Sequence, residues 1–87
     1  MRKLYRQILK RYFHNSLVYT REEMNLTQSQ MAQVLAMDDR SYIDLDHGKS
    51  CCSALTLALF LIYCCRDPVN FLGELRNAFE KGTDAAA

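Results

Sequence analysis

The stretch Leu26–Lys49, LTQSQMAQVLAMDDRSYIDLDHGK, decides the fold. Thr27 is followed three residues later by Gln30, which is the spacing of a capping box and predicts the start of a helix. Asp38 is a second N-cap residue and predicts another helix, which Gly48 is placed to end with a positive φ. The stretch therefore predicts two short helices that follow each other closely.

The apolar residues of this stretch recur at helical spacing, so each helix has one buried face. They are Met31, Ala32 and Leu35 in the first helix, and Tyr42 and Leu45 in the second. The helices are joined across residues 36–37, and the small side chain of Ala32 permits a close crossing. Two short helices joined in this way predict a helix-turn-helix unit over about residues 27–47.

Before this unit, residues 2–13 predict an amphipathic helix with five basic residues on the face opposite an apolar stripe. The stripe consists of Leu4, Tyr5, Ile8, Leu9, Tyr12 and Phe13. The basic face fits a solvated side of a core helix, an arm that faces DNA, or a helix on a membrane surface, and we favour the first. Asn15 or Ser16 is expected to cap a second helix that ends near Met24.

After the unit, Ser53 predicts the cap of an apolar helix through Cys65, and Asp67-Pro68 predicts the start of a last helix. Its buried residues are expected to be Phe71, Leu72, Leu75 and Phe79. Residues 83–87 are expected to form a disordered tail. The expected fold is therefore all-α, a compact five- to six-helix bundle in a single domain, residues 1–82.

Composition agrees with a small helical protein. Of 87 residues, 49% are hydrophobic and 24% charged, and 3 Gly and 1 Pro leave little room for the turns of a many-stranded sheet. The longest apolar run, residues 54–65, is too short for a membrane span of about 20 residues. No leader sequence is evident, so we expect a cytoplasmic protein without membrane contact. The adjacent pairs Cys51-Cys52 and Cys64-Cys65 are expected to be reduced, partly buried thiols.

The unit and its surroundings resemble the phage-repressor class of helix-turn-helix proteins, the Cro/repressor or Xre family, over roughly residues 17–72. The resemblance rests on the spacing of several residues taken together rather than on any single residue. The matching positions are Gln28, Met31, Ala32, Leu35, Met37, Tyr42 and Leu45, followed by Asp46-His47-Gly48-Lys49. It implies a lambda-repressor-like bundle with an extra N-terminal helix, and a transcriptional regulator that binds double-stranded operator DNA.

The resemblance also implies a site. The second helix of the unit, about residues 39–47, enters the major groove, where Asp39, Arg40, Ser41 and Asp44 face the bases. Arg40 is the expected specificity residue, because a guanidinium fits guanine O6 and N7. Gln28 and Lys49 are expected to contact phosphates. The resemblance further implies a partly buried ion pair between Arg21 and Asp46.

The chain departs from the family pattern in two places. The turn position that is commonly Gly is Ala36, where a left-handed backbone costs about 1 kcal/mol. The usually polar outer positions of the fourth helix are Leu55, Leu59 and Ile62. We expect the N-terminal helix to cover part of this surface and a second copy of the chain to cover the rest, which makes a homodimer.

Charge leaves two functions open. The first 14 residues carry five basic side chains, whereas residues 38–49 carry four aspartates against Arg40 and Lys49. DNA binding is the first hypothesis, because the basic helix can offset the acidic unit at phosphates. The alternative is an antitoxin-like or DNA-mimicking inhibitor that binds a basic protein through Asp39 and Asp44. No arranged nucleophile, metal-ligand spacing or phosphate loop is evident, so neither enzyme activity nor a metal or cofactor is expected.

Overall fold

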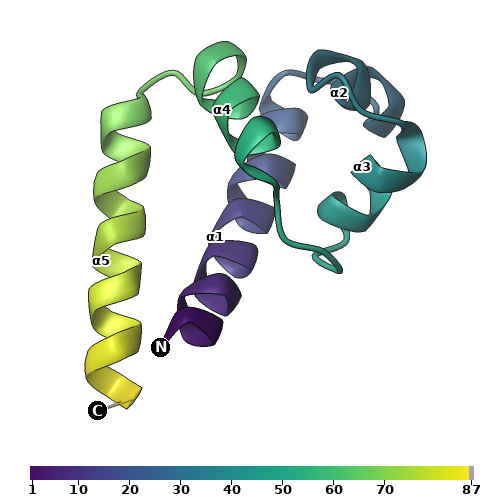
Figure 1. Ribbon diagram of the computed structural model, residues 1–87. Helices are drawn as coiled ribbons and strands as arrows, with labels where there is room; N and C mark the ends of the chain where they lie inside the picture. The colour runs from purple at the N-terminus through teal and green to yellow at the C-terminus, as the bar shows by residue number, and fades with distance from the viewer. Residues whose placement is uncertain (87) are drawn as a thin grey trace.

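A computed structural model describes residues 1–86 as five helices with no strand among them (Figure 1). The helices are α1 (Arg2–Glu23), α2 (Gln28–Val34), α3 (Asp39–Asp46), α4 (Ala54–Tyr63) and α5 (Pro68–Ala86). The expected all-α bundle is confirmed with five helices. The start of α1 and the end of α5 lie at the same end of the molecule, and α2 lies toward the other.

The N-terminal region is one continuous helix, so the prediction of a break near Asn15 or Ser16 was wrong. Asn and Ser each cost less than about 0.7 kcal/mol in a helix interior relative to Ala. Continuing the helix buries Leu17 completely, a gain of about 1.5–3 kcal/mol that outweighs those costs. With no Gly or Pro before the loop, a capping residue alone does not end a helix.

The predicted helix caps around α2 and α3 are confirmed. The Thr27 hydroxyl accepts a hydrogen bond from the backbone N–H of Gln30, whose side chain accepts one from the backbone N–H of Thr27 at 2.8 Å. The backbone between the helices turns through Ala36 at φ +54°, and Gly48 ends α3 at φ +73°. The left-handed residue that ends α1, Asn25 at φ +55°, was not predicted.

The last two helices also begin at the predicted caps. Ser53 caps α4, and a carboxylate oxygen of Asp67 accepts from the N–H of Asn70 at 3.0 Å at the start of α5. The tail expected over residues 83–87 is helical through 86, which corrects the prediction, and residue 87 lies outside the described residues. Alanine is the strongest helix former, and the Thr83 hydroxyl donates to the Glu80 carbonyl at 3.1 Å, so nothing ends the helix earlier.

The core draws on all five helices. Its buried hydrophobic residues are Phe13, Leu17, Met31, Ala32, Leu35, Tyr42, Leu45, Phe60, Phe71 and Leu75. A chain of aromatic contacts joins three helices: Phe13 of α1 meets Phe60 of α4 at 5.2 Å between ring centroids, and Phe60 meets Phe71 of α5 at 5.6 Å. Such contacts add about 0.5–1.5 kcal/mol each beyond the buried area, and they hold α4 between α1 and α5.

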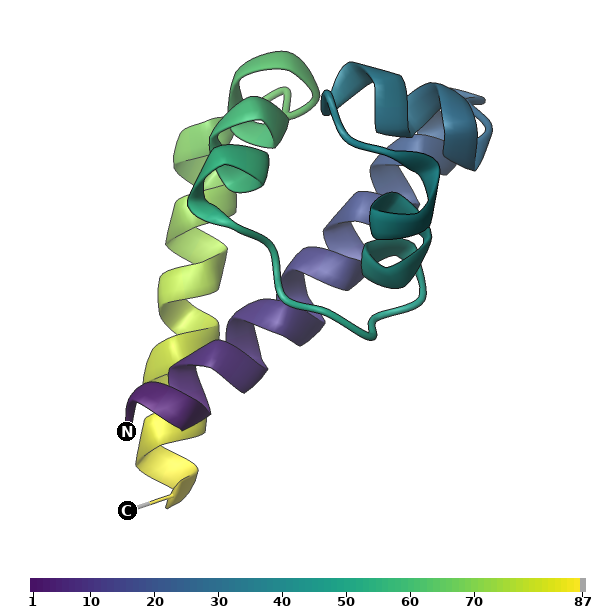
Figure 2. The same cartoon turned by 45° about the vertical axis from the view of Figure 1, so that its right-hand side comes forward.

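Helix α1 packs against α5 rather than against the outer face of α4, and in both views the two helices converge toward the start of α1 and the end of α5 (Figures 1 and 2). Tyr5 meets Phe79 edge-on at 4.9 Å, and a Cβ on Gly82 would come within 2.5 Å of Ile8, so this glycine permits the close approach of the helices. Of the outer positions of α4, Leu59 is partly buried, but Leu55 and Ile62 stay 68% exposed, so α1 does not cover these two residues. The apolar face of α5 lies against α1 instead.

Two further expectations concern the cysteines and membranes. All four cysteines are free and partly buried, and burial, with the neighbouring Cys51, raises the pKa of the Cys52 thiol to about 12. Among the helices described in residues 1–86, none has the length and apolar character needed to span a membrane.

Candidate nucleic-acid interface

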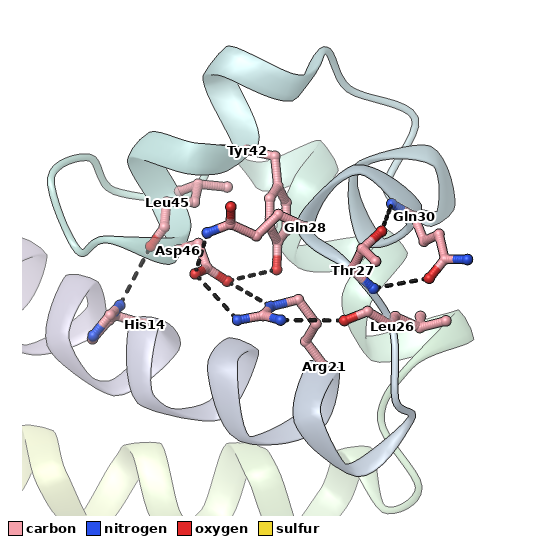
Figure 3. Close-up of polar contacts among 9 residues, drawn as sticks. All are labelled: His14, Arg21, Leu26, Thr27, Gln28, Gln30, Tyr42, Leu45 and Asp46. Atoms are coloured by element: carbon pink, nitrogen blue, oxygen red, sulfur yellow. Dashed lines mark hydrogen bonds and ion pairs between the residues drawn. The ribbon is translucent and has the colours of Figure 1, made fainter.

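A buried carboxylate fixes the position of α3. Asp46, in the last turn of α3, is 6% exposed and accepts hydrogen bonds from three side chains (Figure 3). Arg21 Nε of α1 donates to Oδ1 at 3.0 Å, and the Tyr42 hydroxyl donates to the same oxygen at 2.9 Å. Gln28 Nε2, at the start of α2, donates to Oδ2 at 3.0 Å. One carboxylate therefore ties α3 to both α1 and α2.

The charge state of this cluster follows from the same contacts. Burial opposes ionisation of Asp46, but the donors Gln28, Arg21 and Tyr42 together outweigh it and hold the pKa of Asp46 below its ordinary value. Burial, together with the hydrogen bond to Asp46, raises the pKa of Tyr42, so its hydroxyl keeps its proton. The expected ion pair between Arg21 and Asp46 is present, and Arg21 Nη1 also donates to the Leu26 carbonyl at 3.2 Å.

The first turn of α3 uses two further aspartates for local contacts. The Asp38 carboxylate accepts from the Ser41 backbone N–H at 3.1 Å and from its hydroxyl at 2.8 Å. These bonds lower the pKa of Asp38. The Asp39 carboxylate accepts from the Ser29 hydroxyl of α2 at 3.1 Å. Both charges also lie at the positive end of the α3 dipole, which favours them.

One side of α3 faces away from the core. Tyr42, Leu45 and Asp46 point inward, and Arg40, Asp44 and His47 follow each other on the opposite face at spacings of four and three residues. Arg40 and His47 are exposed and Asp44 is half-buried. Within the described part of the chain, neither Arg40 nor Asp44 makes a side-chain hydrogen bond or ion pair.

The other predicted site residues differ in their surroundings. Ser41 is exposed, but its hydroxyl is engaged with Asp38 as described above. Gln28 is half-buried and one N–H of its amide donates to Asp46, so only the second N–H remains for a phosphate. Lys49 is exposed in the loop after α3, and its backbone N–H closes the helix by donating to the Asp44 carbonyl at 2.8 Å.

Sequence reasoning missed two residues that shape this interface. Tyr42 was assigned to the core alone, although its spacing of four residues from Asp46 places both on one helix face. Ser29 was not considered, and no local pattern pairs it with Asp39 of the next helix. In residues 1–86, no group of three or more His, Cys, Asp or Glu side chains is arranged to hold a metal ion.

The chain matches no family model, no curated protein and no solved structure.

Proposed function

We propose that this protein is a sequence-specific DNA-binding transcriptional regulator of the phage-repressor type, in which α2 and α3 form a helix-turn-helix unit. In this proposal α3 enters the major groove and presents Arg40 to the base edges. One observation supports it most. The outer face of α3 makes few contacts, while the opposite face is fixed by the Asp46 cluster, in which Asp46 accepts hydrogen bonds from Arg21, Gln28 and Tyr42. Base readout needs such a fixed helix, because a small tilt moves every contact at once.

The positions of the aspartates in the helix-turn-helix unit favour this role more than the net charge of the segment suggests. Asp46 is neutralised by Arg21, and Asp38 and Asp39 accept local hydrogen bonds at the helix N-terminus. Asp44 is the aspartate of the unit with no such contact among the described residues. Arg40 and Asp44 therefore stand against each other on the outer face of α3, while Asp38 and Asp39 keep their charge at the helix N-terminus, where the helix dipole partly offsets it.

The competing proposal is an inhibitor that binds a basic protein through Asp39 and Asp44. It is less well supported, because the exposed Asp39 already accepts a hydrogen bond from the Ser29 hydroxyl and lies at the positive end of the α3 dipole. The acidic side chain on the outer face of α3 that makes no such contact among residues 1–86 is the half-buried Asp44. Recognition of a basic surface usually relies on several free charges of one sign.

We also propose that the regulator acts as a homodimer. Leu55 and Ile62 on α4 are each 68% exposed, and Tyr63 beside them is 67% exposed. An apolar surface of this kind on a small protein is typical of an interaction site. A two-fold dimer would also present two copies of α3 to two half-sites of an operator.

The direct test is binding of the purified protein to duplex DNA from upstream of its own gene, compared with scrambled duplex, at low and physiological salt. We expect preference for the upstream duplex and an affinity that falls steeply with salt. Arg40→Ala is expected to reduce that preference by roughly 5- to 150-fold, which corresponds to about 1–3 kcal/mol.

The matched control is Arg76→Ala, which removes the same charge from an exposed position on α5. It is expected to leave the preference unchanged. Absence of DNA binding by the wild-type protein at low salt would refute the proposal. In that case, loss of a basic protein partner in Asp39→Asn and Asp44→Asn variants would support the competing one.

A further inference from the structure

An open concavity of about 290 Å³ lies where α1 passes the C-terminal end of α3. Its lining comes from two segments far apart in the sequence. The residues are Gln7, Lys10, Arg11 and His14 of α1, and His47 and Gly48 at the end of α3. Two permanent positive charges, two imidazoles and an amide thus surround one hollow, and no acidic side chain is among them.

The orientation of His14 is fixed by a contact with α3. Its Nδ1 lies 3.4 Å from the Leu45 carbonyl oxygen, which only accepts, so Nδ1 carries the proton of this long hydrogen bond. The other ring nitrogen lies on the far side of the ring from Leu45 (Figure 3). Among the described residues, Nε2 therefore makes no hydrogen bond.

Gly48 allows the two segments to meet. It has φ +73°, and a Cβ at this position would lie 3.3 Å from the His14 ring. A side chain here is therefore strained by the backbone and also presses on the imidazole. The absence of a side chain keeps the hollow open beside Lys10 and Arg11.

The end of a helix carries partial negative charge, which by itself repels an anion. Here the last carbonyls of α3 already accept backbone hydrogen bonds. His47 N donates to the Ile43 carbonyl at 2.9 Å, and Gly48 N donates to the Leu45 carbonyl at 3.0 Å. With these carbonyls satisfied, the full charges of Lys10 and Arg11 dominate the hollow.

We propose that this concavity binds a phosphate group, and that its source is the backbone of the DNA that α3 reads. The inference rests on the proposed function and extends it, because it supplies the phosphate neutralisation that α3 lacks. His47 belongs both to the outer face of α3, in line with Arg40 and Asp44, and to the hollow. A duplex lying along α3 therefore meets Lys10 and Arg11 at the end of the reading face.

The test measures DNA affinity against salt concentration for Lys10→Gln, Arg11→Gln and the control Lys81→Gln, which removes the same charge from an exposed site on α5. Each lost phosphate contact lowers the slope of log affinity against log salt by about 0.9. When salt rises from 50 to 200 mM, Lys10→Gln and Arg11→Gln are each expected to lose about 3.5-fold less DNA affinity than the wild type. Specific and scrambled duplexes are expected to respond alike, and Lys81→Gln is expected to keep the wild-type slope.

A second arm separates this inference from the proposed function. Inorganic phosphate is titrated at constant ionic strength against chloride, and the ring signals of His14 and His47 are followed by NMR. Saturable shifts that are lost in Lys10→Gln support a phosphate site even if the wild type binds no DNA, in which case a free phosphate compound is the source. Wild-type DNA binding with unchanged slopes in both hollow variants overturns the DNA backbone as the source. Absence of phosphate-dependent shifts as well overturns the site.

Discussion

Arg21→Ala removes the charged partner of a carboxylate that is 6% exposed, so it tests whether the Asp46 cluster holds the fold together. Truncating one member of a buried ion pair costs about 3–5 kcal/mol, because the remaining charge stays buried. Asp46 keeps hydrogen bonds from Gln28 and Tyr42, and the Arg21 side chain is 18% exposed, which both reduce the cost. The variant also loses the bond to the Leu26 carbonyl, worth about 1 kcal/mol.

These contributions place the loss near the lower end of the range, at about 3 kcal/mol. For a domain of this size, 1 kcal/mol corresponds to roughly 4–8 °C in Tm. Arg21→Ala is therefore expected to lower Tm by about 12–24 °C, measured by circular dichroism of the helices during heating.

The matched control is Arg76→Ala. Arg76 Nε and Glu80 Oε1 are 3.1 Å apart, close to the 3.0 Å of the Arg21 pair, but their side chains are 80% and 60% exposed. Exposed pairs of this spacing contribute below about 0.5 kcal/mol, so Tm is expected to fall by at most about 4 °C. Equal Tm losses in the two variants would refute the argument that burial, rather than geometry, makes the Arg21 pair important.

Three further predictions concern stability and assembly. The lowered pKa of Asp46 means that its stabilisation is complete above about pH 4, the value in the unfolded chain, and is lost as pH falls through the folded value. The difference in free energy of unfolding between wild type and Asp46→Asn, from urea titrations, is thus expected to be larger at pH 7 than at pH 3, and an equal difference at both pH values would contradict this. Ala36→Gly relieves a positive φ of 54°, which costs about 1 kcal/mol, and adds an entropy cost of about 0.4–1 kcal/mol, so the net gain in stability is expected to lie between zero and about 0.6 kcal/mol, and a fall in Tm would count against strain there. Sedimentation at high protein concentration is expected to show a dimer of the wild-type protein. The double variant Leu55→Glu and Ile62→Glu is expected to be a monomer with unchanged helix content. A wild-type monomer would reject the α4 face as a dimer surface.

Local signals in the sequence predicted the local parts of the structure. Caps at Thr27, Asp38 and Ser53 specify where helices start, because their side chains satisfy backbone N–H groups within three residues. The same logic failed at Ser16, where a capping residue lies inside α1 and tertiary burial decides the outcome. The sequence did not predict which helix α1 packs against. Both α4 and α5 have apolar faces, and in the structure α1 packs mainly against α5.

The charge of the candidate site likewise depends on residues that are distant in the sequence. A count over residues 38–49 weighs every aspartate equally, although Asp46 is balanced by Arg21 from another helix. The count also omits Lys10 and Arg11, which precede the stretch by many residues yet line the hollow at its end. Electrostatic potential depends on distance in space, so basic side chains far away in the sequence can offset the aspartates of an acidic segment. For this protein, the salt dependence of DNA binding by Lys10→Gln and Arg11→Gln measures whether these two charges reach phosphates, which the sequence count cannot do.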